Sequence, residues 1–220
     1  MAASIIPAIE AGARMVLLEE FKASEALRLI EQEKITIHNG VPTMFILELN
    51  HPGFGDMDLS SLRTGIIDAA PCPEEIVRKI RMEMGCNVVV AYGSTETSFT
   101  LTVTSLEDDD SIRSQTVGKP TSGSEVKIID ANRNEMPSGG IGEIICRSPC
   151  VMKGYFEMPE KTSEAIDSDG WFHTGDLGTM DEEGYLRIVG RKKEVIIRGG
   201  YNIYPREIEE LLYKHQSVLE

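Results

Sequence analysis

The chain has 220 residues and a formal net charge of −14, from 36 acidic and 22 basic side chains. This length allows one large domain or a domain and a half with a buried core, and a composition of 41% hydrophobic and 26% charged residues is ordinary for a globular protein. The negative charge argues against nucleic acid as a partner, because such a surface repels a phosphate backbone.

The first 21 residues form an apolar but interrupted segment. Pro7, Glu10 and Arg14 break it, so no run approaches the ~18 uninterrupted apolar residues of a membrane-spanning helix. The segment also lacks the basic start and clear cleavage site of a signal peptide. We therefore predict no transmembrane segment and interpret this stretch as core structure.

Helices and strands alternate through the next part of the chain. Ser24 is the expected cap of the first helix, and Pro42 and Pro73 begin the other two. Alternation of this kind, with continuously apolar strands, is typical of a parallel sheet covered on both faces. We assign residues 1–110 to part of an N-terminal α/β subdomain. Its predicted helices cover 23–33, 42–50 and 73–84, and its predicted strands cover 35–37, 64–68 and 87–91.

An acidic run, Glu107-Asp108-Asp109-Asp110, ends this region. A run of like charges is usually solvated, so we expect a solvated loop here, with a metal site as the alternative.

The middle of the chain changes character. Clusters of Gly, Pro and Ser separate short strands over 125–130 and 142–147, which predicts antiparallel β structure in a small barrel or a distorted sheet. A short helix over 159–167 and hairpins over 171–198 follow. We assign 111–190 to a β-barrel-like subdomain. Residues 191–220, with a strand at 195–198 and a helix from Pro205, would begin a small α+β C-terminal domain.

The four cysteines are Cys72, Cys86, Cys146 and Cys150. None forms a CxxC pair, and their spacing fits neither a zinc site nor the disulfide framework of a small secreted fold. We interpret them as free buried thiols in a reducing compartment, which favours a cytoplasmic location.

The sequence AYGSTE at 91–96 follows the last apolar strand. In an open α/β sheet, ligands bind where loops leave the carboxyl ends of the strands. Tyr92 offers a flat face for a purine, and Gly93 allows close approach of the backbone. Ser94 and Thr95 offer hydroxyls to phosphate oxygens, and Glu96 offers a hard oxygen to Mg²⁺. Taken alone, the same residues also suit a strand, a turn and a helix cap.

The sequence WFHTGD places Asp176 beside a glycine, in what we expect to be a turn. Its two carboxylate oxygens match the vicinal hydroxyls of a ribose, although a turn aspartate that caps its own backbone is the simpler interpretation. Arg191 follows after a predicted hairpin and could bind the same ribose or the phosphate, or form a surface ion pair. His173 could be a general base, but we expect it to pack beside Trp171.

Three further features accompany these motifs. Asp68-Ala69-Ala70-Pro71 ends a strand with small residues that would leave room for a flat ring, or is a plain strand-to-helix turn. Gly199 and Gly200 form a turn, or let a thin substrate arm pass close to the backbone. Lys192 and Lys193 are expected to be solvated.

In this order and spacing, DAAP, YGSTE, GWFHTGD and GRKKEVIIRGGYNIYPREIEE resemble the AMP-forming acyl-CoA synthetases of the adenylate-forming superfamily. The resemblance extends from about residue 10 to the end and is strongest over 170–210. It implies an enzyme that activates a carboxylic acid, either a fatty acid or another small organic acid, as an acyl-adenylate and transfers it to the thiol of CoA. ATP or AMP, Mg²⁺ and CoA would be bound.

The resemblance also implies a role for each matching position. Tyr92 and the Asp68–Ala70 backbone would lie beside adenine, Thr95 would contact the α-phosphate, and Glu96 would hold Mg²⁺. Asp176 would bind the ribose hydroxyls with help from Arg191. Lys193 falls at the hinge where the C-terminal domain rotates, Gly199 and Gly200 would line the pantetheine route, and Val41–Phe45 would lie near the acyl pocket.

The chain departs from the family pattern at both ends. A Ser/Thr/Gly-rich phosphate loop with its lysine should precede the matched segment, and a lysine that assists adenylation should follow Glu220. We therefore expect a central piece of a synthetase with negligible ligase activity of its own, because fixed charges supply much of catalysis. The alternatives are an adenylation module that loads a carrier protein, a luciferase-like oxidase, or a non-catalytic nucleotide-binding or interaction remnant. The acid and the oligomeric state are not predicted.

Overall fold

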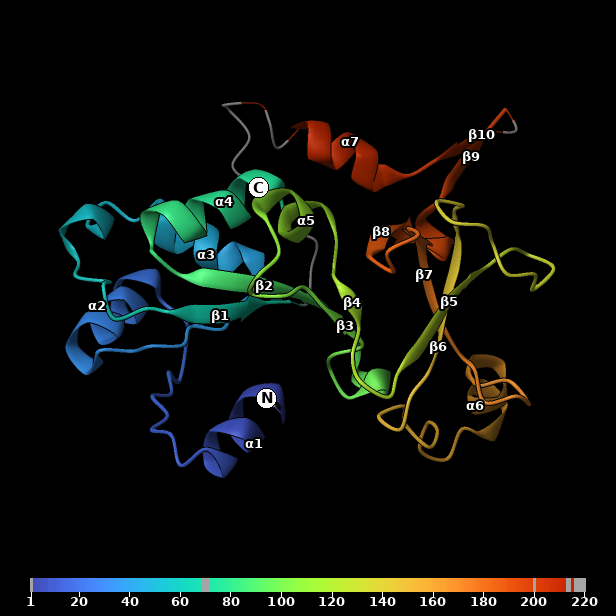
Figure 1. Ribbon diagram of the computed structural model, residues 1–220, viewed down its shortest axis with the longest axis horizontal. Helices are drawn as coiled ribbons and strands as arrows, with labels where there is room; N and C mark the ends of the chain where they lie inside the picture. Colours follow the sequence, from blue (N-terminus) through green and yellow to red (C-terminus); the bar gives the residue numbers. More distant parts are fainter. Residues whose placement is uncertain (1, 69–71, 200, 213–214, 216–220) are drawn as a thin grey trace.

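The computed structural model describes residues 2–68, 72–199, 201–212 and 215 of the chain (Figure 1). Its α-helices are α1 (Ala2–Glu10), α2 (Ala23–Glu33), α3 (Pro42–Leu49), α4 (Glu74–Glu83), α5 (Asp110–Gln115), α6 (Pro159–Ala165) and α7 (Pro205–Leu212). Its 3₁₀ helices are η1 (Phe54–Asp56), η2 (Thr95–Thr97) and η3 (Lys192–Glu194). Its strands are β1 (Thr64–Ile67), β2 (Asn87–Tyr92), β3 (Thr102–Val103), β4 (Lys119–Pro120), β5 (Glu125–Ile129), β6 (Gly142–Arg147), β7 (Phe172–Met180), β8 (Leu186–Arg191), β9 (Ile196–Arg198) and β10 (Tyr201–Ile203).

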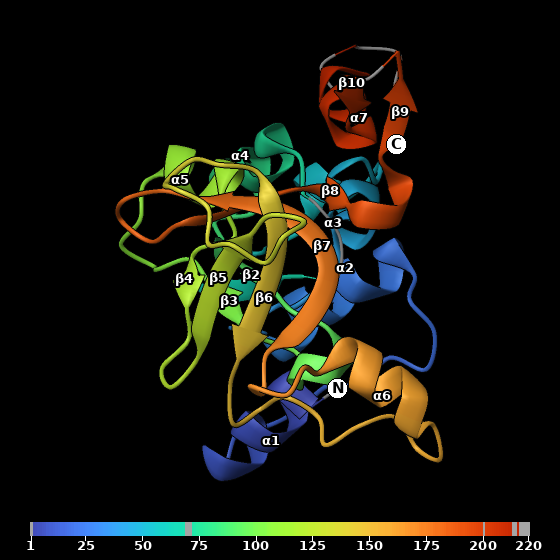
Figure 2. The ribbon, with the colours of Figure 1, turned by 90° about the vertical axis from the view of Figure 1, so that its right-hand side faces the viewer.

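The first region is built on the parallel pair β1 and β2, with Ile67 opposite Val90. The segment that contains Ile37 lies beside β1 and pairs with it through an isolated parallel bridge from Ile37 to Thr64. Helices α3 and α4 lie on one side of the two strands and α1 lies on the other, while α2 contacts α3 (Figures 1 and 2). The predicted parallel sheet with alternating helices is thus confirmed. The core between sheet and helices consists of apolar side chains, among them Leu27, Phe45, Ile67, Ile80 and Val88.

Two predictions about the N-terminal helices are wrong. The residue that caps α2 is Lys22, which has an extended backbone and makes no side-chain cap hydrogen bond, while Ser24 lies inside the first turn. Helix α1 is not core structure in the described part of the chain, because Ile6 and Ile9 on it are 63% and 66% exposed.

A buried polar pair sits inside this core. Glu48 on α3 is fully buried, and its carboxylate oxygen Oε2 lies 2.9 Å from Nε2 of His38. The ring of Phe45 meets the His38 ring edge-on, with the centroids 5.0 Å apart. A buried carboxylate requires a partner, and this contact fixes α3 against the chain that precedes β1.

The second region is an antiparallel sheet in the order β5-β6-β7-β8. Register shifts between Glu143 and Ile145 and between Leu177 and Gly178 bend it, as β-bulges do. Within the described residues this sheet is open, so the distorted sheet, rather than a closed barrel, is what the structure contains. The short strand β4 pairs with β3 of the first sheet, and the predicted boundary at residue 110 stays a prediction.

The C-terminal region contains the hairpin β9–β10 followed by α7. Both elements lie above the rest of the chain in Figure 1, and α7 contacts β8. The predicted strand and the helix from Pro205 are confirmed. Among the described residues, no helix combines the length and the apolar character needed to cross a membrane.

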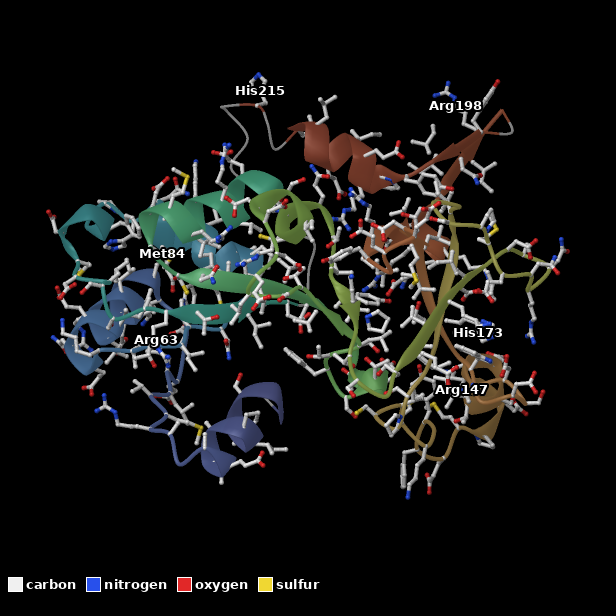
Figure 3. All side chains as sticks on the ribbon, in the orientation of Figure 1. Arg63, Met84, Arg147, His173, Arg198 and His215 are labelled. Atoms are coloured by element: carbon white, nitrogen blue, oxygen red, sulfur yellow. The ribbon has the colours of Figure 1, made fainter. Side chains whose placement is uncertain are left out.

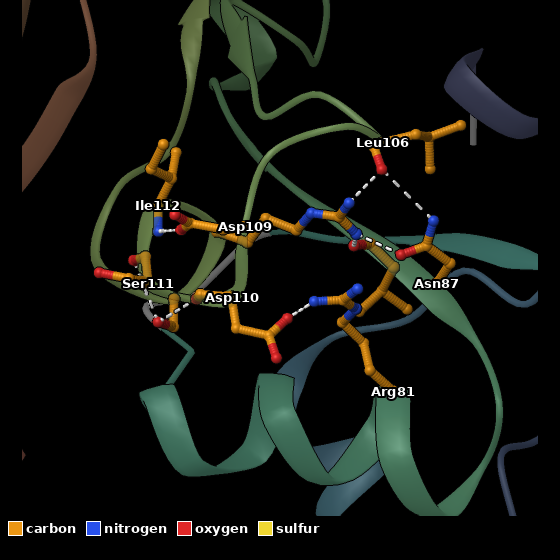
Figure 4. Close-up of polar contacts among 10 residues, drawn as sticks. Arg81, Asn87, Leu106, Asp109, Asp110, Ser111 and Ile112 are labelled. Atoms are coloured by element: carbon orange, nitrogen blue, oxygen red, sulfur yellow. Dashed lines mark hydrogen bonds and ion pairs between the residues drawn. The ribbon is translucent and has the colours of Figure 1, made fainter.

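The acidic run 107–110 is not simply a solvated loop, as we had expected. The Asp109 carboxylate caps α5 by accepting a hydrogen bond of 2.8 Å from the Ile112 amide. Asp110 forms an ion pair with Arg81 on α4 (Figure 4). Asp108 accepts a hydrogen bond of 2.8 Å from the Tyr185 hydroxyl. The run therefore joins α5 to α4 and to the turn before β8.

Arg113 on α5 is buried against β2, with 1% of its surface exposed. Its guanidinium donates to the Asn87 side chain, to the Val88 carbonyl at 3.1 Å and to the Leu106 carbonyl. The Asn87 side-chain amide also donates to the Leu106 carbonyl at 3.5 Å (Figure 4). Because the Arg113 side chain is buried and binds acceptors both on β2 and at Leu106, it fixes the 105–115 segment to the edge of the first sheet.

We predict that Arg113→Leu lowers the free energy of unfolding by about 2–4 kcal/mol, because it removes this donor from one buried and two partly buried acceptors while keeping much of the volume. Urea denaturation followed by circular dichroism measures this change. The exposed Arg78→Leu on α4 is the matched control and should change stability by no more than about 0.5 kcal/mol. Equal stability of the two variants would contradict the role assigned to Arg113.

Candidate functional site

Two predicted site segments lie at one edge of the first sheet. Asp68 directly follows β1 and Tyr92 ends β2, and the carboxyl ends of parallel strands meet at the same edge. Asp68 is 8% exposed. Ala69 and Ala70 lie outside the described residues, so their place beside a ligand stays a prediction.

A hydrogen bond joins this edge to the second sheet. The Tyr92 hydroxyl donates to Oδ2 of Asp176 on β7 at 2.7 Å, across 84 residues of sequence. The Asp176 amide donates to Oγ1 of Thr174 at 3.1 Å, and that hydroxyl donates to the Ile144 carbonyl at 2.8 Å. Asp176 is therefore held by its own strand and presented to the end of β2.

The glycine beside Asp176 had suggested a turn, but Asp176 lies within strand β7. Gly175 has a φ of +73°, a conformation that L side chains rarely adopt, and the register of β7 shifts just after Asp176. Arg191 on β8 is its partner in register, and Arg191 Nε lies 3.6 Å from Asp176 Oδ1. The hairpin predicted to bring these two residues together is confirmed.

The charge of Asp176 is held in a partly buried place. Desolvation raises the pKa of its carboxyl above the usual range, and the negative charges of Glu194 and Glu96 raise it further. The Tyr92 hydrogen bond and the Arg191 charge oppose this shift. Burial, followed by the Asp176 charge, also raises the pKa of the Tyr92 phenol, which keeps its proton as the donor.

The segment 93–99 forms a tight turn after Tyr92. A Cβ atom on Gly93 would lie 1.7 Å from the Phe99 carbonyl oxygen, so no side chain fits there. Glycine is therefore required here because the turn itself brings the Phe99 carbonyl against residue 93. Ser98 and Phe99 have φ values of +54° and +95°, which are uncommon for residues with side chains and indicate local strain.

Thr95 and Glu96 lie on η2, inside this turn. Thr95 is exposed, and Oε1 of Glu96 accepts a hydrogen bond of 3.0 Å from the Tyr155 hydroxyl. Desolvation alone would raise the pKa of Glu96, but its own backbone amide and the hydroxyls of Ser94 and Tyr155 hold that pKa below its ordinary value. Glu96 is therefore available as an anion.

The site fits a magnesium ion only if a ligand completes the coordination. Among the described residues, no group of three or more His, Cys, Asp or Glu side chains is placed to hold a metal. Mg²⁺ commonly binds through one or two carboxylates, substrate phosphates and water. A single ionised carboxylate, Glu96, on an exposed turn suits that mode.

His173 does not make the contact expected with Trp171. Its ring nitrogens lie 3.6 Å from Oε2 of Glu143 and 3.5 Å from Oδ2 of Asp167. The Trp171 ring instead faces the Arg147 guanidinium at 4.9 Å. Figure 3 shows Arg147 and His173 close to α6, away from the C-terminal hairpin. His173 on β7 therefore lies between the Glu143 and Asp167 carboxylates and does not belong to the site around Tyr92.

The remaining candidates are less tightly placed. Lys193 is exposed on η3, directly after β8, whereas Lys192 is not simply solvated, because its Nζ lies 2.9 Å from Oε2 of Glu143. Gly199 has a φ of +61° in the turn after β9, and Gly200 lies outside the described residues. Phe45, expected near an acyl pocket, is fully buried in the first core.

Two residues that take part in this geometry were missed in the sequence. Thr174 positions the Asp176 amide, and Tyr155 holds the Glu96 carboxylate. Thr174 lies inside the WFHTGD motif, where a hydroxyl two residues before an aspartate is a recognisable local signal. Tyr155 lies 59 residues from its partner, and no local pattern predicts that contact.

The described cysteines are all free thiols. Three are buried, and desolvation raises the pKa of Cys72, Cys86 and Cys146 to about 12 in each case. Cys150 is exposed, which corrects the expectation that all four are buried.

Comparison with known proteins identifies the family of this chain. The model of the AMP-binding enzyme family matches residues 1–156. The putative acyl-CoA synthetase YngI of Bacillus subtilis (strain 168) is 46% identical over 218 residues, which cover 98% of this chain and 40% of YngI. The mitochondrial medium-chain acyl-CoA ligase ACSF2 of Mus musculus is 40% identical over 212 residues, which cover 95% of this chain and 34% of ACSF2.

Among solved structures, ATP-bound MatB from Rhodopseudomonas palustris matches with a TM-score of 0.88 and 35% identity. The match covers 98% of this chain and 42% of MatB. The predicted combination of a partial α/β region with a β region is confirmed by this likeness. The chain spans less than half the length of each of these three proteins.

We predict that Asp176→Asn is more stable than the wild type at neutral pH. Because the folded-state pKa of Asp176 is raised, its protonated form stabilises the fold below the ordinary carboxyl pKa, and this contribution is lost as the pH rises through the raised value. Asparagine stays neutral, so its advantage should grow over the same interval. Urea midpoints measured at neutral pH and below the ordinary carboxyl pKa would show the difference.

The control for this experiment is the exposed Asp56→Asn, which should leave both midpoints unchanged. A variant Asp176→Asn that is less stable than wild type at neutral pH would show that the ionised carboxylate stabilises the fold. The assigned balance between desolvation and hydrogen bonding would then be wrong.

Proposed function

Because this chain belongs to the AMP-binding enzyme family, we propose that it forms the adenosine-binding part of the active site of an acid–CoA ligase, with a fatty acid as the substrate. The observation that carries the proposal is the hydrogen bond between Tyr92 and Asp176, which places an aromatic ring and a partly buried carboxylate together at the end of a parallel strand.

The nucleotide would bind at this junction. The flat ring of Tyr92 would lie against adenine, with the backbone of 68–70 on its other side. Oδ2 of Asp176 already accepts the Tyr92 hydroxyl, and a carboxylate has acceptor sites to spare for the two ribose hydroxyls. Arg191, half in solvent next to Asp176, would donate to the ribose or to a phosphate oxygen.

The phosphate end would extend towards the 93–97 turn. A carboxylate oxygen of the acid attacks the α-phosphorus of ATP, a P–O bond forms, and pyrophosphate leaves to give an acyl-adenylate. Thr95 would donate to the α-phosphate, and Gly93 and Ser94 would shape the turn around it. Glu96 would hold Mg²⁺, and the bound ion would neutralise charge on the phosphate oxygens.

Thioester formation would involve the C-terminal region. The thiolate of CoA attacks the acyl carbon, and AMP leaves as the carbon–sulfur bond forms. Lys193, exposed directly after β8, would mark the hinge between 111–190 and 191–220. Gly199 and Gly200 would border the pantetheine arm, since glycines allow close approach to the backbone. Val41–Phe45, at the start of α3, would lie near the acyl pocket.

Two observations bear on the acid and on the compartment. The name of ACSF2 gives medium-chain acyl groups as its substrates, which supports a fatty acid for this protein. The free thiols support a reducing compartment, and we place the protein in the cytoplasm. The other partners would be ATP and CoA.

We predict that Asp176→Ala weakens AMP binding about tenfold or more, because it removes hydrogen bonds to a charged acceptor. Isothermal titration with AMP, in the absence of metal, measures this directly. Asp56→Ala, which removes an exposed carboxylate from η1, is the control and should bind AMP as the wild type does. Equal AMP affinity of wild type and Asp176→Ala would overturn the proposed site.

A further inference from the structure

The carboxylate of Glu96 is held by a segment that none of the motifs includes. Residues 150–155 lie alongside the 96–98 turn and contact it at three places. The Met152 amide donates to the Glu96 carbonyl at 2.7 Å, and the Ser98 hydroxyl donates to the Cys150 carbonyl at 2.8 Å. The third contact is the side-chain hydrogen bond of 3.0 Å from the Tyr155 hydroxyl to Oε1 of Glu96.

Tyr155 is itself fixed from the other side, by α6. Its amide donates to Oγ1 of Thr162 at 2.9 Å, and the Thr162 hydroxyl donates to the Met158 carbonyl at 2.9 Å. A Cβ atom on Gly154 would lie 2.7 Å from the Thr162 methyl group, so the glycine is what allows α6 to approach this closely. The phenol thus reaches Glu96 from a braced backbone rather than from a free loop.

We propose that Tyr155 is a positioning residue, which orients the Glu96 carboxylate towards the metal ion of a bound metal–nucleotide complex. This inference rests on the proposed function, in which Glu96 holds Mg²⁺. The phenol binds Oε1, and the Glu96 amide and the Ser94 hydroxyl also donate to the carboxylate. A carboxylate has about four acceptor sites, so at least one remains for the cation. Without the phenol, the carboxylate would have to be ordered when the metal binds, and affinity would fall.

The hydrogen-bond partners of metal ligands have measurable effects. Loss of such a partner typically lowers metal affinity 10–100-fold. Because Tyr155 is about one-third exposed and contributes one hydrogen bond, we expect the lower end of this range. Its contact is to Glu96 and not to Tyr92 or Asp176, so the adenosine part of the site should not change.

The test compares nucleotide affinity with and without metal, and needs no turnover. Calorimetry with ATP in Mg²⁺ and in EDTA gives the gain in affinity due to the metal, and electron paramagnetic resonance of Mn²⁺ in the ternary complex reports the ion itself. In Tyr155→Phe we expect the gain to fall about tenfold. AMP affinity without metal should stay at the wild-type value.

Two further variants make the result decisive. Tyr185→Phe removes a phenol that donates to a different carboxylate, Asp108, at 2.8 Å, and should leave the metal-dependent gain in ATP affinity unchanged. Glu96→Gln should abolish most of this gain. If Glu96→Gln loses the gain and Tyr155→Phe keeps it, the positioning role is overturned while the proposed function stands. If the wild type shows no metal gain, or Glu96→Gln keeps it, the role of Glu96 fails and that of Tyr155 fails with it.

Discussion

The hydrogen bond from Tyr92 to Asp176 is the contact on which the geometry of the site depends. It joins the last residue of β2 in the first sheet to β7 in the second, 84 residues later. The energetics are finely balanced. Taking the Asp176 carboxylate out of water is unfavourable, as its raised pKa indicates, and the phenol together with Arg191 offsets part of that cost. A carboxylate that was satisfied entirely within the protein would have little left to offer a ligand.

Near this contact the backbone is strained at Phe99 and lies close to other backbone segments at Gly93 and Gly178. Gly93 is required because the Phe99 carbonyl occupies the place of a side chain, and Phe99 itself has a φ of +95°. On the other sheet, a Cβ atom on Gly178 would lie 2.6 Å from the Arg187 carbonyl, so glycine allows β7 and β8 to stay paired just beyond Asp176. Features of this kind cost stability and are common where a fold has been shaped for binding.

The second region contacts both the first region and the start of the C-terminal region. Segment 150–155 is attached to the turn that carries Glu96, and Glu143 on β6 is in contact with both His173 and Lys192. Lys192 comes immediately before the residue proposed as a hinge. The region of the antiparallel sheet therefore contacts the 93–99 turn on one side and the start of the C-terminal region on the other. The family model identifies the chain as an AMP-binding enzyme, and each of these contacts is a property of this chain.

Local sequence determined most of the elements and the identity of the family. Helices at 23–33, 42–49 and 205–212 follow from apolar spacing and from proline at helix starts, and the register that places Asp176 opposite Arg191 follows from a short hairpin. These features depend on residues a few positions apart. Only the tertiary structure decided that Asp176 lies in a bulged strand and that His173 lies between two carboxylates. It also decided that the acidic run joins α4 and α5, and that Tyr155 holds Glu96. Such contacts join side chains far apart in the chain, and their partners are selected by packing and by the need to satisfy buried polar groups, which no local pattern encodes.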